Sequence, residues 1–412
     1  MGGMRWLARA AFFVGLLAIL VSFFGGLQEN GSLEKIKERV VGRLWAEEGA
    51  GEKVIYDITY MPEVPVDNKN RTQIGKEKAT LFMLVRNWEL HEALDSMRKI
   101  EDRFNRKYRY PWTFLNDEEF TDEFKALTKG MASGEVDYGF IDPKIWNKPD
   151  FIDDEIMQAN MEDMERREVV YGGSLSYRNM CRFNSGHFFR QPIVDKYDWY
   201  WRVEPGIDFY CDVNYDPFEF MRINNKKYGF VITIYEYVDT IPTLWNVSEE
   251  FFKAHPEYLA KDNALEFVTD KTQLRRFDLD LHSGNDYNLC HFWSNFEIGN
   301  LNFFRSREYV EFFEHLDKSG GFYYERWGDA PVHTIGLSAF LNRSEIHHFS
   351  DFGYKHEPYH RCPKDDASVL SGRCLCPRNH DEDVDFADFS CLPKWWYHAG
   401  RYFLFNFTEK PM

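Results

Sequence analysis

The sequence predicts an α/β fold with a Rossmann-like, three-layer sheet, and features of its first half support this. An uninterrupted apolar run at 79–85 is typical of a buried parallel strand. Two more strand-like runs follow, at 111–117 and near 138–141. Between these runs, apolar residues recur at helical spacing in 90–106 and again in 120–128. Strands that alternate with helices in this way indicate a sheet with helices packed on its faces.

The next predicted strand, at 197–203, is aromatic and stops at Glu204-Pro205. Proline has no N–H to donate to a sheet ladder, so the strand should end there with Glu204 at its carboxyl end. In open α/β sheets the ligand crevice lies at that end of the strands. We interpret Glu204 as part of a site for a metal and a phosphorylated ligand, together with the acids that follow it (Asp208, Asp212 and Asp216). Ordinary solvated acids of a turn would give the same pattern.

Farther along, the sequence predicts one more strand and then three helices (228–235, 244–255, 262–269 and 307–316). Glu297 lies inside an aromatic, buried-looking segment, where an unpaired carboxylate would be costly, so we expect it to be partnered or functional. Asp329 lies in an expected loop before a helix and could be the N-cap of that helix.

Composition and missing motifs narrow the function classes. A net charge of −17 over 412 residues argues against nucleic-acid binding, which needs clustered lysine and arginine. A nucleotide ligand stays open, because a divalent cation can neutralise a diphosphate. The chain has no GxGxxG after its first strand, no P-loop pattern and no GxSxG. These absences argue against dinucleotide-binding enzymes, P-loop NTPases and hydrolases with a nucleophile elbow.

The N-terminal segment predicts a membrane anchor. Residues 10–27 are apolar and about as long as a membrane span, with Arg5 and Arg9 before them and Glu29 after them. This asymmetry predicts a single-pass type II protein with four parts (cytosolic tail 1–9, signal-anchor transmembrane helix 10–27, lumenal stem 28–78 and lumenal catalytic domain 79–412). A cleaved signal peptide is the alternative, although 23–26 is a poor cleavage site.

Sequons and cysteines agree with a lumenal position. Asn-x-Ser/Thr triplets begin at five asparagines (Asn30, Asn70, Asn246, Asn342 and Asn406). Four of the seven cysteines fall in one short segment near the C-terminus, at spacings that fit no standard zinc finger. We therefore expect disulfides, with at least one cysteine free or paired with another chain.

Six sequence blocks make the chain similar to glycosyltransferase family 15, the fungal α-1,2-mannosyltransferases of the Golgi membrane. They are LVRN at 84–87, YPWTFLND at 110–117, YGGSLSYRNMCRFNSGHFF at 171–189, YWRVEPGIDFYCDVNYDPF from Tyr200, SNFEIGNLNFFRS from Ser294 and YERWGDAPVH from Tyr324. The resemblance implies a GT-A-type fold with a mixed sheet. It also implies retaining transfer of mannose from GDP-mannose, with Mn²⁺, to a mannose-terminated glycan or glycoprotein. The α-1,2 linkage is implied by the resemblance alone.

The resemblance also implies which residues bind the metal and the donor. Glu204 and His356 match the family's metal ligands. Carboxylate and imidazole ligands suit Mn²⁺ better than Mg²⁺. Gly206 stands where some relatives have an aspartate, so a third acid of this motif is in doubt. Arg86 and Tyr177 match positions beside the donor.

For catalysis, Glu297 matches the carboxylate proposed as nucleophile, and Asp329 matches an acid near the acceptor. Tyr177 and Arg178 could align the diphosphate and the anomeric centre. Retention needs either a nucleophile such as Glu297 or a same-face mechanism through an ion pair, and the sequence leaves both open.

Two other functions fit parts of the pattern. A catalytically inactive, lumenal glycan-binding subunit would share the fold, but every expected catalytic acid is present. A glycosidase that uses Glu297 and Asp329 would not need a metal at a diphosphate position. The sequence leaves open the acceptor, the disulfide pairing and any assembly into a mannosyltransferase complex.

Overall fold

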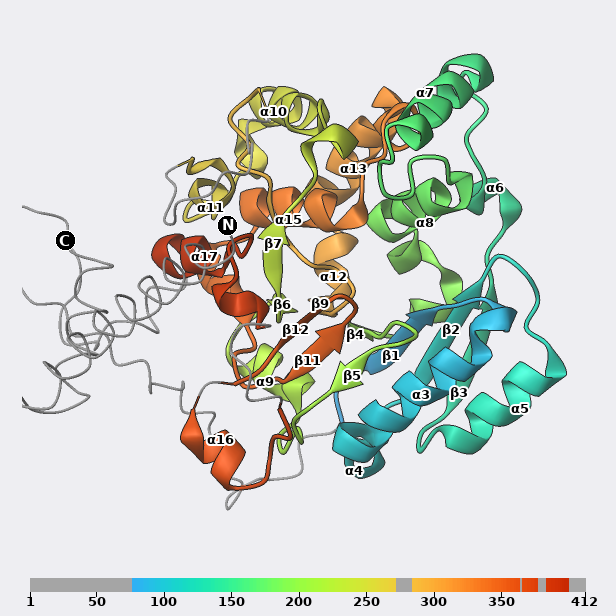
Figure 1. Ribbon diagram of the computed structural model, residues 1–412, viewed down its shortest axis with the longest axis vertical. Helices are drawn as coiled ribbons and strands as arrows, with labels where there is room; N and C mark the ends of the chain where they lie inside the picture. Colours follow the sequence, from blue (N-terminus) through green and yellow to red (C-terminus); the bar gives the residue numbers. More distant parts are fainter. Residues whose placement is uncertain (1–75, 272–283, 364, 377–382, 400–412) are drawn as a thin grey trace, which may run out of the picture. The chain divides into compact units, whose positions relative to one another are not determined.

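The computed structural model describes residues 76–271, 284–363, 365–376 and 383–399 (Figure 1). The transmembrane helix expected at 10–27 and nearly all of the stem expected at 28–78 lie outside these residues. None of the helices in the described part has the length and apolar character needed to cross a bilayer.

A mixed sheet forms the centre of the described chain, with strand order β10-β6-β9-β4-β1-β2-β3. Its strands are β1 (Ala79–Leu84), β2 (Trp112–Asn116), β3 (Val136–Phe140), β4 (Trp199–Arg202), β6 (Tyr228–Phe230), β9 (Glu297–Asn300) and β10 (Ile346–His348). Neighbouring strands pair in parallel except at β9, which runs antiparallel to both β4 and β6. The expected mixed sheet is confirmed.

The direction of β9 brings its first residue to the carboxyl end of β4. In the register of this pair, Glu297 lies opposite Arg202 and Gly299 lies opposite Tyr200. A Cβ atom at Gly299 would lie only 2.5 Å from Cε1 of Tyr200, so the glycine leaves room for this ring to cross β9. The carboxyl edge of β4 therefore carries polar groups from two strands that run in opposite directions.

Helices cover both faces of the sheet and form the three layers that the sequence predicts. Alternate residues of β1 point to opposite faces. Leu81 and Met83 belong to the core that includes residues of α3 (Leu90–Ile100) and α5 (Asp122–Met131). Phe82 belongs to the core on the other face, with α8 (Leu175–Gly186), α12 (Leu301–Phe304), α13 (Arg307–Ser319) and α15 (Asp329–Phe340) (Figure 1).

The remaining elements are two small antiparallel sheets and shorter helices. The sheets are β12-β11-β5 and β7-β8, with bounds β5 (Asp208–Phe209), β7 (Thr233–Tyr235), β8 (Cys290–Phe292), β11 (Tyr354–His356) and β12 (Tyr359–Arg361). The helices are α4 (Arg106–Tyr108), α6 (Pro143–Trp146), α7 (Asp154–Arg166), α9 (Pro217–Ile223), α10 (Leu244–Ala254), α11 (Leu265–Thr269), α14 (Gly321–Tyr324), α16 (Asp366–Leu370) and α17 (Leu392–His398). The run at 228–235, expected as one strand, is split between β6 and β7, and only its first half joins the central sheet.

Disulfides bond six of the seven cysteines, all of which lie among the described residues. The pairs are Cys211–Cys374, Cys290–Cys391 and Cys362–Cys376. Cys181 is buried and free, as the odd count required. The expected disulfides are confirmed.

The histidine that follows α8 makes folding sensitive to acid. Burial, with Arg182 and Arg190 nearby, lowers the pKa of His187 to about 3. An unfolded histidine titrates near 6.5, so between about pH 6.5 and pH 3 only the unfolded chain binds this proton. The free energy of unfolding should therefore fall as the pH falls through this window, by about 1.4 kcal/mol per pH unit from this residue.

We expect His187→Phe to remove this contribution to the pH dependence. Nε2 of His187 has no hydrogen-bond partner among the described residues, and its ring centroid lies 5.1 Å from that of Phe313. Phenylalanine can keep this ring contact and does not bind a proton. Urea unfolding at pH 7 and pH 4.5 measures the effect, with the exposed His91→Gln variant as control. Equal slopes for wild type and His187→Phe would contradict the prediction.

Candidate active site

Arg202, the last residue of β4, lies among three carboxylates. Its Nε donates to Oε1 of Glu204 at 2.9 Å, and its Nη1 donates to Oδ2 of Asp329 at 2.6 Å. Oε1 of Glu297 lies 3.8 Å from the same Nη1. Burial alone would lower the pKa of Arg202, but the three carboxylates raise it well above its ordinary value. A permanently charged guanidinium thus holds these three acids together.

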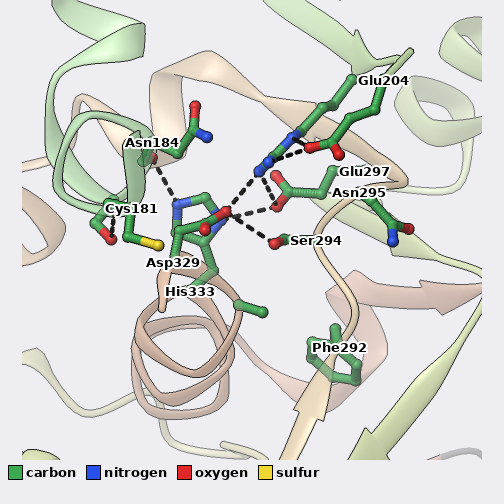
Figure 2. A network of polar contacts seen from close by, with 12 residues as sticks. Cys181, Asn184, Glu204, Phe292, Ser294, Asn295, Glu297, Asp329 and His333 are labelled. Atoms are coloured by element: carbon green, nitrogen blue, oxygen red, sulfur yellow. Dashed lines mark hydrogen bonds and ion pairs between the residues drawn. The ribbon is translucent and has the colours of Figure 1, made fainter. Parts of the chain in front are cut away.

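Glu297 begins β9 and has no exposed surface. The hydroxyl of Tyr200 donates to Oε2. Oε1 lies 3.0 Å from Nδ1 of His333 (Figure 2). A carboxylate removed from water is stable only when its oxygens are bonded, and here both are. The residue expected to act as nucleophile is therefore closed to solvent.

His333 is placed between two hydrogen-bond acceptors on α15. Its Nδ1 faces Oε1 of Glu297, and its Nε2 lies 3.0 Å from the backbone oxygen of Asn184 (Figure 2). A carbonyl oxygen can only accept, so Nε2 must carry a proton. Burial lowers the pKa of His333, but the carboxylate of Glu297 outweighs this and raises it above its ordinary value. His333 therefore donates from Nε2 to Asn184, and through Nδ1 it forms a buried hydrogen-bonded pair with Glu297.

Asp329 is the first residue of α15, after the N-cap Gly328, so it is not the cap itself. Its Oδ2 accepts from Arg202 and, at 2.8 Å, from the hydroxyl of Ser294 (Figure 2). A carboxylate in the first turn of a helix is also stabilised by the helix dipole. These three interactions stabilise the carboxylate of Asp329, which is only 5% exposed.

Glu204 and His356, the two expected metal ligands, lie side by side at the partly exposed end of this network. Nε2 of His356, at the end of β11, is 3.5 Å from Oε2 of Glu204. Nδ1 of His356 donates to the backbone oxygen of Glu357 at 3.0 Å, so in the neutral imidazole the lone pair is on Nε2. Burial alone would raise the pKa of Glu204, but Arg202 and His356 lower it to about 2.

The chemistry of these two side chains fits Mn²⁺. One carboxylate oxygen and one neutral imidazole nitrogen are ligands that Mn²⁺ accepts, and the backbone carbonyl that orients the imidazole is a usual outer-shell partner. Among the described residues, no group of three or more histidine, cysteine, aspartate or glutamate side chains is arranged to hold a metal. A metal at this pair would need its other ligands from a bound molecule or water.

Tyr177, on α8, and Arg86, just after β1, flank the site. The ring of Tyr177 stacks on Tyr171, with centroids 4.4 Å apart, and the guanidinium of Arg326 lies 5.1 Å from its centroid. Arg86 follows β1, donates to the Ser176 hydroxyl of α8 at 2.5 Å and has a side chain that is 35% exposed. Both residues are placed where a ligand at the carboxyl edge of the sheet could contact them.

Arg178 does not join this site, which differs from the role expected for it. It has no exposed surface, and its Nε donates to the backbone oxygen of Glu325 at 3.0 Å. Its Nη1 donates to the backbone oxygen of Ser174 at 3.2 Å. With its donors bonded to backbone oxygens and, through Nη2, to Sδ of Met164, Arg178 ties α8 to the segment before α15 and is not available to a diphosphate.

The three acids that follow Glu204 also lie outside the site. Asp208 pairs with Lys99 at 2.7 Å, and Asp212 pairs with Arg103 at 2.6 Å. Asp216 is the N-cap of α9 and accepts from the hydroxyl of Tyr110 at 2.6 Å. The interpretation of all four acids as one site was therefore wrong, and only Glu204 belongs to it.

Comparison with known proteins decides the family. Residues 42–399 match the family described as glycolipid 2-alpha-mannosyltransferase. The chain belongs to this family. It is therefore a glycosyltransferase, and the mannosyltransferases of this family include close relatives. The chain is 52% identical over 349 residues to the probable mannosyltransferase KTR2 of Saccharomyces cerevisiae, covering 84% of this chain and 82% of that protein.

Solved structures of this mannosyltransferase family share the fold. The mannosyltransferase Ktr4p of S. cerevisiae, in complex with GDP, matches with a TM-score of 0.77 and 38% identity, covering 89% of this chain and 98% of that one. Core-mannan synthase A of Aspergillus fumigatus, in its Mn/GDP-form, matches with a TM-score of 0.73 and 36% identity, covering 87% and 93%.

Three site residues of this mannosyltransferase were not singled out from its sequence. Arg202, Ser294 and His333 each lie within a quoted family block. The sequence itself contains a signal for two of these three residues. Arg202 is the charged residue of a buried aromatic strand and must be partnered. His333 follows Asp329 by four residues, which places both on one face of a helix.

Proposed function

We propose that this chain is a retaining α-1,2-mannosyltransferase that moves mannose from GDP-mannose to a mannose-terminated glycan or glycoprotein, with Mn²⁺ as cofactor. The arrangement of Arg202, Glu204 and His356 at the carboxyl edge of β4 carries the proposal. It occurs in a chain 38% identical to a mannosyltransferase solved with GDP. A relative in a Mn/GDP-form supports the metal, and the family description supports the linkage.

In this proposal the protein contributes fixed charges at one edge of a GT-A-type domain. Glu204 and His356 would hold Mn²⁺, which supplies positive charge to stabilise a departing diphosphate. Arg202 fixes the Glu204 carboxylate through Nε, so that this ligand does not have to reorganise. Tyr177 and Arg86 would contact the donor from α8 and from the end of β1.

The burial of Glu297 favours the same-face mechanism. Attack on an anomeric carbon needs a carboxylate oxygen within about 3–3.5 Å of it. Glu297 has no exposed surface, and both of its oxygens are bonded. We therefore infer that retention proceeds through an ion pair on one face of the sugar, and that Glu297 positions Arg202 and Tyr200.

We also propose that the protein is a single-pass type II protein of the Golgi membrane with its catalytic domain in the lumen. Three disulfides support an oxidising compartment. The anchor at 10–27 lies outside the described residues. Protease protection of intact vesicles would test the orientation, because a lumenal domain is cut only after the membrane is opened.

The enzymatic test uses purified protein with GDP-mannose and methyl α-mannoside. We would run it with Mn²⁺, with Mg²⁺ and with a chelator, and follow both GDP release and disaccharide formation. An α-1,2-linked dimannoside that forms with Mn²⁺ and disappears with chelator is the expected result. Folded protein that yields neither product would favour the inactive glycan-binding subunit instead.

We expect Glu204→Ala to lower transfer by about a hundredfold or more, because the metal loses its carboxylate ligand. Asp212→Ala is a matched control, since that acid pairs with Arg103 outside the site. Activity and thermal unfolding would be measured for both variants. Transfer at the wild-type rate in a folded Glu204→Ala protein would refute the metal role.

A further inference from the structure

Arg326, between α14 and α15, is a buried arginine whose donors are poorly satisfied. The residue is 4% exposed, and its Nε has no hydrogen-bond partner among the described residues. The nearest carboxylate oxygen is Oε1 of Glu236, 3.7 Å from Nη2. A guanidinium carries five N–H donors, and leaving them unpaired in a buried place is costly.

The other buried arginines of the described chain differ from Arg326 in this respect. Arg182 donates to both carboxylate oxygens of Asp317, at 2.7 and 2.9 Å. Arg361 donates to Asp385 and to several backbone oxygens, and Arg178 donates to backbone oxygens. No carboxylate or backbone oxygen of the described residues lies within hydrogen-bond distance of the guanidinium of Arg326. The side chain of Tyr177 is hydrogen-bonded to Arg326, but Nε keeps no partner among the described residues and could bind a ligand.

Glu236, which follows β7, offers acceptor capacity beside this arginine. Its Oε1 accepts from the backbone N–H of Tyr237 at 2.8 Å and lies 3.4 Å from the Thr240 hydroxyl. Its Oε2 accepts no hydrogen bond from the described residues, although the side chain is only 11% exposed. The Nε donor of Arg326 and this Oε2 acceptor of Glu236 are thus both left open.

This Glu236–Arg326 pair adjoins the active site without contacting the metal ligands. Arg326 lies over the ring of Tyr177 and precedes Asp329 by three residues. Asp329 in turn bonds Arg202, which bonds Glu204. No ion pair or hydrogen bond joins the pair to Glu204 or His356 within the described part of the chain.

The chemistry of the pair points to a neutral, hydroxyl-rich ligand. A phosphate would meet the negative charge of Glu236 beside the arginine, which disfavours it. Two neighbouring sugar hydroxyls can instead donate to Oε2 of Glu236 and accept from the guanidinium, so both buried groups become satisfied. We propose that Glu236 and Arg326 bind adjacent hydroxyl groups of the acceptor mannose. This inference rests on the proposed function and adds the residues that select the acceptor.

The test compares acceptor use with nucleotide binding in Glu236→Gln and Arg326→Lys. Glutamine keeps the shape of Glu236 but loses its charge. Lysine keeps the charge of Arg326 but loses the planar set of N–H donors of the guanidinium. We expect each variant to raise the KM for methyl α-mannoside about tenfold. The Kd for GDP with Mn²⁺, measured by calorimetry, should stay within about twofold of wild type, because the pair does not contact the metal ligands.

A matched control and the GDP titration distinguish a failure of this inference from a failure of the proposed function. Glu249→Gln removes an exposed carboxylate that pairs with Lys253 on α10, and its acceptor KM should equal that of wild type. Wild-type acceptor KM in both Glu236→Gln and Arg326→Lys would overturn the inference and leave the proposed function intact. Wild-type protein that binds no GDP with Mn²⁺ would overturn the proposed function itself. GDP binding by each variant also verifies that it is folded.

Discussion

Replacing Arg202 by methionine is expected to abolish transfer and to destabilise the protein. The change removes the cation that bonds Glu204 and Asp329 and lies 3.8 Å from Glu297. Breaking a buried charge network by removing one partner typically costs about 3–5 kcal/mol. Because the donor site also loses its fixed charge, we expect transfer to fall at least about a thousandfold.

Two further variants make the result interpretable. Arg202→Lys keeps one positive charge but cannot donate to two carboxylates in the same geometry. Relative to Arg202→Met, it should therefore recover more of the stability than of the transfer activity. Arg98→Met removes an exposed arginine that pairs with Asp102, and should change neither the stability nor the transfer activity. Denaturant unfolding and the GDP-mannose assay measure the two effects. Wild-type stability in Arg202→Met would mean that the three carboxylates do not depend on it.

His333→Leu should be the second most damaging change, through stability. Leucine leaves Glu297 as a buried carboxylate without its imidazole partner, while the Asn184 carbonyl loses its donor. The free energy of unfolding should fall by about 3–5 kcal/mol. Arg202 would then be drawn towards Glu297, so transfer should fall as well.

A double-mutant cycle with Glu297→Gln tests this pair directly. Glutamine removes the charge that His333 stabilises, so the double variant should lose less stability than the two single losses added together. A coupling free energy of about 1.5 kcal/mol or more is expected. Additive losses would contradict the assignment of His333 as the partner of Glu297. The exposed His91→Leu variant controls for the substitution itself.

The first half of the fold follows from local pattern alone. The apolar run at 79–85 and the strand at 111–117 correspond to β1 and β2, with α3 between them. β1 and β2 are adjacent strands joined through α3, and the period and length of each run suffice to predict these elements, although β1 also pairs with the distant β4. The split of 228–235 could not be predicted this way, because both halves are apolar and only the partner strands distinguish them.

The site was partly predictable for a related reason. Glu204 was found because a proline marks the end of its strand, and His356 because of family resemblance. From the local sequence alone, Arg178 and Asp208 cannot be distinguished from functional residues. Their tertiary partners, backbone oxygens for Arg178 and Lys99 for Asp208, decide otherwise, and no sequence period reports such partners.

The placement of β9 has a consequence for synthesis of the chain. The strands β1 to β4 can pair as soon as they emerge, but β4 keeps one edge open until 297–300 have been made. An open edge strand presents unpaired N–H and C=O groups to other chains. During translation the growing polypeptide therefore carries an aggregation-prone edge next to Arg202, whose later partners Glu297 and Asp329 have not yet been made. A chaperone that covers extended segments would be needed most during this interval, and a pause in translation before β9 would lengthen it.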